Sequence, residues 1–110
     1  MKYTGSVTEL NSLCSLTEPN WDLLDVIITK ERIAIDWRED AASCCLVLYS
    51  HDDALVEYSG LMTMCERPSL VGHVSAYRWN VVGKGVLLLA KWEIDGNAGI
   101  CMFELERSQP

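Results

Sequence analysis

Two alternating stretches near the end of the chain flank a turn signal, and they constrain the fold more than any other part of the sequence. Residues 86–94 and 98–106 lie on either side of Asp-Gly-Asn at positions 95–97. Asp-Gly and Gly-Asn both favour two-residue turns, because these residues tolerate positive φ. The sequence therefore predicts a long β-hairpin, with either dipeptide at its turn.

The choice of turn decides the register of this hairpin but not its faces, because both loops contain an even number of residues. A turn at Asp-Gly sets Ala90 opposite Cys101, whereas a turn at Gly-Asn sets Trp92 there. One face holds the predicted core residues Leu88, Ala90, Trp92, Ile94, Cys101, Phe103 and Leu105. The other face carries Lys91, which we expect to neutralise Glu93 or Glu104, and the apolar residues Leu87, Leu89, Ile100 and Met102. Such a face is too apolar for water, so we expect a further layer or a second copy to cover it.

The rest of the chain shows short β-type runs separated by turn signals, without a long amphipathic helix. We predict a single domain over residues 1–110, an all-β antiparallel meander that forms a small barrel or a strongly curved sheet. The predicted strands cover residues 2–10, 23–29, 32–38, 43–50, 54–60 and 71–82, with loops at 11–20 and 66–69.

One segment leaves an α+β alternative open, with a short helix near residues 18–25. Trp21, Leu24 and Ile28 recur at helical spacing, and Pro19 suits the first turn of a helix. Against this, residues 26–29 are mostly β-branched, which favours a strand. We expect a single helical turn before Leu23 and a strand after it.

Composition and charge exclude several classes of function. The chain has 110 residues, 49% of them hydrophobic, and a formal net charge of −7. A negative field disfavours binding to nucleic acid and to anionic membranes. The five cysteines form no CxxC pair, and the first residues contain no apolar signal-peptide core. We therefore expect a cytoplasmic protein with free thiols, no cofactor and no metal site.

Residues able to carry catalysis are sparse. His51 opens a His-Asp-Asp turn at positions 51–53, and a solvated turn explains it better than a metal site. His73 follows Cys65 in sequence without any nucleophile signature. A small enzyme would have to use His73 or carboxylates that face each other within the sheet, the candidates being Glu57, Glu93 and Glu104.

The segment 77–80 combines aromatic and polar side chains on alternate faces. Tyr77 and Trp79 share one face, and Arg78 shares the other with Asn80. Aromatic rings beside a guanidinium suit a ligand or partner hot spot. The alternative that we favour places the two aromatic rings in the core and the polar pair in solvent.

These observations rank three hypotheses for function. The first is a non-catalytic binding or protein-interaction domain that forms a homo-oligomer through Leu87, Leu89, Ile100 and Met102. The second is a β-barrel with an aromatic-lined pocket for a small apolar or aromatic ligand, the lining residues being Tyr58, Tyr77, Arg78, Trp79 and Trp92. The third is the enzyme that uses His73 or strand glutamates.

Overall fold

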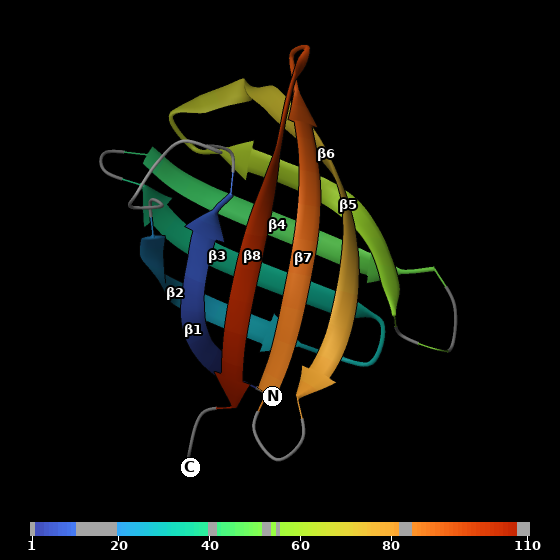
Figure 1. The fold of residues 1–110 in the computed structure, drawn as a ribbon. Helices are drawn as coiled ribbons and strands as arrows, with labels where there is room; N and C mark the ends of the chain where they lie inside the picture. Colours follow the sequence, from blue (N-terminus) through green and yellow to red (C-terminus); the bar gives the residue numbers. More distant parts are fainter. Residues whose placement is uncertain are drawn as a thin grey trace.

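Eight antiparallel strands close into a barrel in the computed structural model of this chain, which describes residues 2–10, 20–39, 42–51, 54, 56–81 and 85–107 (Figure 1). Each strand pairs with its neighbours in sequence, and β1 also pairs with β8 to close the ring. This confirms the prediction of an all-β antiparallel meander. The strands are β1 (Lys2–Glu9), β2 (Asn20–Ile28), β3 (Arg32–Glu39), β4 (Ala42–Ser50), β5 (Glu57–Met64), β6 (Arg67–Val81), β7 (Gly85–Ile94) and β8 (Asn97–Arg107).

The two ends of the barrel differ in what lies there. In Figure 1, β1, β8, β7 and β6 form the near wall, and β2 to β5 cross behind them. The end that holds the β7–β8 turn is called the hairpin end, and the end that holds Lys2 and Arg107 is called the terminal end. Within the described residues no helix is long and apolar enough to cross a membrane.

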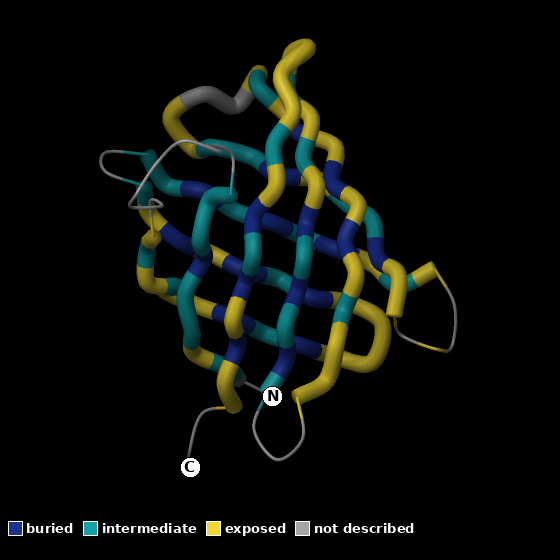
Figure 2. Tube along the Cα trace, viewed as in Figure 1, coloured by how far each residue is buried: buried dark blue, intermediate teal, exposed yellow. Residues whose placement is uncertain are grey.

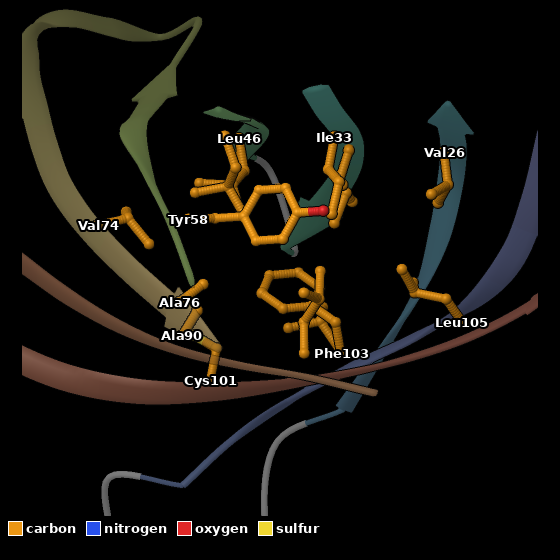
Figure 3. Packing of buried hydrophobic residues seen from close by; sticks show 14 of the residues in the cluster. Val26, Ile33, Leu46, Tyr58, Val74, Ala76, Ala90, Cys101, Phe103 and Leu105 are labelled. Carbon is orange, nitrogen blue, oxygen red and sulfur yellow. The ribbon is translucent and has the colours of Figure 1, made fainter. Parts of the chain in front are cut away.

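Buried residues fill the interior and alternate with more exposed ones along much of the sheet, as the burial colours show (Figure 2). Its largest fully buried side chains include Trp37, Tyr58 and Phe103, none of them more than 1% exposed. Trp37 of β3 and Phe103 of β8 meet edge to face, with ring centroids 5.4 Å apart. Because β1 and β2 separate these two strands around the ring, this contact spans the interior. Figure 3 shows Tyr58 and Phe103 pointing into the same packed space.

The final hairpin forms as predicted, with Asp95-Gly96 at its turn. Both turn residues have positive φ, 49° and 81°, as a type I′ turn requires. Ala90 pairs with Cys101, so the register is the one that an Asp-Gly turn sets. The predicted core face is the inner face of the barrel.

The helix predicted near residues 18–25 is wrong over its described part, because β2 begins at Asn20. Residues 18 and 19, and the rest of the predicted loop up to 19, lie outside the described residues. A β-bulge between Leu23 and Asp25 shifts the pairing register with β3. Trp21 precedes this bulge and Ile28 follows it, and both face inward because the bulge breaks the period-two pattern. Leu24, the third residue of the apparent helical spacing, is exposed.

Strand β6 is longer than predicted, since it begins at Arg67 rather than at residue 71. The predicted loop at 66–69 is therefore wrong over residues 67–69, because the turn consists of Cys65 and Glu66. The Glu66 carboxylate accepts a hydrogen bond from the Ser43 backbone N–H at 2.8 Å, which ties this turn to β4.

Candidate functional site

An apolar surface runs across the outside of β6, β7 and β8. The strand registers align Tyr77 with Leu89 and Met102 in one row, and Trp79 with Leu87 in the next. We call this surface the outer apolar face, and it consists of Tyr77, Trp79, Leu87, Leu89, Ile100 and Met102. It joins the predicted aromatic pair to the predicted outer side of the hairpin, which the sequence analysis treated as two separate features.

The aromatic pair is the most exposed part of the outer apolar face. Tyr77 is 48% exposed and Trp79 is 50% exposed, and their ring centroids lie 6.4 Å apart. Our expectation that these rings belong to the core is wrong. Inside the barrel at this level the ladder pairs Ala76 with Ala90, because Tyr58 and Phe103 already fill the space. At this level of β6 the small side chain of Ala76 therefore points inward, and the rings of Tyr77 and Trp79 point outward.

Charged side chains lie at the two ends of the outer apolar face. Lys91 is at the hairpin end, where it pairs with Ile100, and Glu104 is at the terminal end, where it pairs with Leu87. Along β7, Leu87 comes two residues before Leu89 and Lys91 comes two residues after it, so Leu89 lies midway between them. Among the described residues Lys91 has no ion-pair partner, so the expected neutralisation by Glu93 or Glu104 does not occur.

A surface pocket of about 370 Å³ opens at the terminal end of this face. Val81 of β6 with Gly85 and Leu87 of β7 line one side of it, Glu104 and Glu106 of β8 line its middle, and Gly5 and Ser6 of β1 line the far side. Gly85 lies between Val81 and Glu106 in the strand ladder. A Cβ atom at Gly85 would lie 2.0 Å from the Leu105 carbonyl oxygen, so this position admits only glycine and the pocket floor stays open.

Arg78 points inward near the terminal end of the barrel rather than into solvent. Its Nη1 donates a hydrogen bond to the Tyr58 hydroxyl at 3.1 Å, and its Nε donates to Asn80 Oδ1 at 3.0 Å. Tyr58 is only 1% exposed, so this bond satisfies a buried hydroxyl. Arg78 therefore has a structural role: it covers the buried Tyr58 ring and satisfies its hydroxyl.

Trp92 lies toward the hairpin end, apart from the other predicted ligand residues. Its indole Nε1 is buried and makes no hydrogen bond to a described residue. The N–H lies near the Cys101 thiol, outside hydrogen-bond geometry, and only partly offsets the rise in that thiol's pKa. The five predicted ligand residues therefore separate into an inner pair, Tyr58 and Arg78, an outer pair, Tyr77 and Trp79, and Trp92 alone.

Two thiols and two carboxylates face each other at the hairpin end. Glu39 Oε2 accepts a hydrogen bond from Trp37 Nε1 at 2.7 Å and one from the Cys44 thiol at 3.9 Å. Burial raises the pKa of Cys44 to about 12, and the charge of Glu39 adds to this rise. Burial and Glu9 likewise raise the pKa of Cys101, whose thiol donates to Glu9 Oε1 at 3.5 Å. Both thiols stay protonated near neutral pH, which makes them poor nucleophiles.

The residues of the enzyme hypothesis lie on the outside of the barrel. His73 is exposed and pairs with Leu61 and Glu93 in the ladder. Glu57 and Glu104 are exposed as well. His51 Nε2 lies 2.7 Å from Ser59 Oγ, and its predicted turn partners at 52 and 53 are outside the described residues. Across the described ranges, no three His, Cys, Asp or Glu side chains gather to hold a metal ion.

No protein family model, no curated protein and no solved structure matches this chain. The candidate site thus stands on its own geometry. Sequence reasoning found the apolar residues of the hairpin's outer face and placed Lys91 beside them, but it missed the pocket. Extending the pairing of β7 to the strand before it would have put Trp79 beside Leu87 and revealed one continuous surface.

Proposed function

We propose that this protein is a non-catalytic interaction domain that self-associates through the outer apolar face. One observation carries this proposal: the half-exposed rings of Tyr77 and Trp79 continue directly into the aliphatic rows of the hairpin. Large exposed apolar patches on a folded domain mark interaction surfaces, and aromatic side chains dominate their energetics.

The exposed apolar area is enough to form the centre of an interface. Half of a tyrosine and half of a tryptophan expose roughly 200 Å² together, since each ring can bury about 150–250 Å². At about 25 cal/mol per Å², burying this area on both copies gives roughly 10 kcal/mol before the costs of association. Those costs are of similar size, so the proposal is a reversible dimer and not an obligate one.

The partner proposed here is a second copy of the same chain. Two-fold pairing needs a surface that is complementary to itself. The outer apolar face meets this need, because its apolar rows lie in the middle and it carries a cation at one end and carboxylates at the other. The small-ligand hypothesis stays a prediction, and of its five residues Tyr58 and Arg78 face inward whereas Tyr77 and Trp79 face outward.

Light scattering coupled to size-exclusion chromatography tests the proposal. The wild-type chain at concentrations up to about 1 mM should show a concentration-dependent dimer, and Leu89→Glu with Met102→Glu should stay monomeric. Leu24→Glu is the matched control, because Leu24 is exposed on β2 in the opposite wall and should leave the dimer intact. A wild-type chain that remains monomeric throughout this range would refute the proposal.

A further inference from the structure

The pocket at the terminal end of the outer apolar face has the chemistry of a receptor for a lysine side chain. Val81 and Leu87 provide apolar walls, and Glu104 and Glu106 provide exposed carboxylates on the neighbouring strand β8. A lysine buries its aliphatic stem on apolar surface and keeps its ammonium group near polar atoms. Neither carboxylate has an ion-pair partner within the described part of the chain.

Lys91 lies at the matching position on the opposite side of the same face. It is exposed and borders a second hollow of about 280 Å³, formed with Leu10 and residues 98–100. Leu87 and Lys91 are each two residues from Leu89, or about 7 Å at the usual strand rise. The pocket and the lysine are therefore placed almost symmetrically about the row of Leu89 and Met102.

This symmetry fixes how two copies fit together. A two-fold axis that lies in the interface and runs across the strands through the Leu89 row turns one copy over onto the other. It brings the hairpin end of one face against the terminal end of its partner, so that Lys91 of each copy lies over Leu87 and Glu104 of the other. The aromatic rings of the two copies then pack around the Leu89 rows.

We propose that the pocket formed by Val81, Gly85, Leu87, Glu104 and Glu106 receives Lys91 of a second copy, so that the dimer contains two identical lysine–carboxylate contacts. This inference rests on the self-association proposed above and adds its geometry. It assigns the glycine at position 85 a task in the interface, because the side chain of any other residue would displace the floor of the pocket.

Charge reversal tests the inference through the dimer dissociation constant, measured by sedimentation. Lys91→Glu puts a carboxylate against two carboxylates, and Glu104→Lys with Glu106→Lys puts a lysine against two lysines. Each variant alone should raise the dissociation constant at least tenfold. Mixed one to one, the two variants should form a heterodimer of near wild-type affinity, because every contact then joins opposite charges.

The outcomes separate this inference from the self-association on which it rests. Lys30→Glu makes the same change of charge in the turn between β2 and β3 and should leave the dissociation constant unchanged. If Leu89→Glu with Met102→Glu abolishes the dimer but Lys91→Glu does not weaken it, the lysine contact is refuted and self-association stands. A mixture that fails to form heterodimers refutes the contact as well. A monomeric wild-type chain refutes both proposals.

Discussion

Replacing Phe103 with alanine should remove a large part of the stability of this barrel. Phe103 is fully buried, and the ladder fixes it between Val7 of β1 and Leu88 of β7. Strands held on both sides cannot move in to fill the space, so the loss should reach about 4 kcal/mol, within the usual range for phenylalanine truncation. The edge-to-face contact with Trp37 is part of this loss.

A loss of this size is easy to measure, because native proteins are typically stable by only about 5–15 kcal/mol. Urea unfolding followed by tryptophan fluorescence gives the free energy directly, and the melting temperature should fall by about 15–20 °C. All variants should be measured at one protein concentration, low enough for the chain to be monomeric, because association would add to the apparent stability. Phe103→Leu keeps most of the volume and should lose less than about 1.5 kcal/mol.

Tyr49→Ala is the matched control, because it also deletes an aromatic ring but from an outward position on β4 that is 55% exposed. It should lose less than about 1 kcal/mol. If Phe103→Ala destabilises the chain no more than Tyr49→Ala does, then Phe103 does not lie in a closed interior and the reasoning above fails.

Two further predictions concern the polar groups at the ends of the barrel. Arg78→Met should lower the free energy of unfolding by about 1–3 kcal/mol, because it leaves the buried Tyr58 hydroxyl without its hydrogen-bond donor. In a double-mutant cycle with Tyr58→Phe, additive losses of stability would contradict this contact. The second concerns pH: the pKa values of Cys44 and Cys45 are raised from an ordinary 9.0 to about 12 and about 11. The unfolded chain therefore loses these thiol protons first, so the stability contribution is intact below pH 9 and declines between pH 9 and these raised values. Urea midpoints from pH 8 to 11 should fall less steeply in Cys44→Ala than in the wild-type chain, and equal slopes would count against the burial of this thiol.

The hairpin was predictable because all its information is local. Alternation along β7 and β8 and the Asp95-Gly96 turn agree with each other, and a single turn fixes the whole register. The start of β2 was not predictable in the same way, because the bulge after Leu23 interrupts the alternation and the exposed Leu24 completes an apparent helical spacing. Closure of the ring also escapes local patterns, since β1 and β8 lie at opposite ends of the sequence.

The candidate site was predictable only in pieces. Apolar character identified four of the six residues of the outer apolar face: Leu87, Leu89, Ile100 and Met102. The orientation of Tyr77 was mistaken, because ring size suggested burial, whereas the barrel interior had room only for Ala76 at that level. Which side of a strand points inward depends on the volume that other strands have already filled, and no single strand contains that information.

The pairing of β1 with β8 has a consequence for folding kinetics. Seven of the eight strand pairings join neighbours in sequence, and the eighth joins Lys2–Glu9 to Asn97–Arg107. Long-range pairing is slow, because the loop-closure entropy is lost before the contact is gained. We therefore expect the pairing of β1 with β8 to form last during folding, after the other strands have paired with their neighbours. A second copy bound to the outer side of β8 would hold one edge of this seam in place, so that association would slow the opening of the ring.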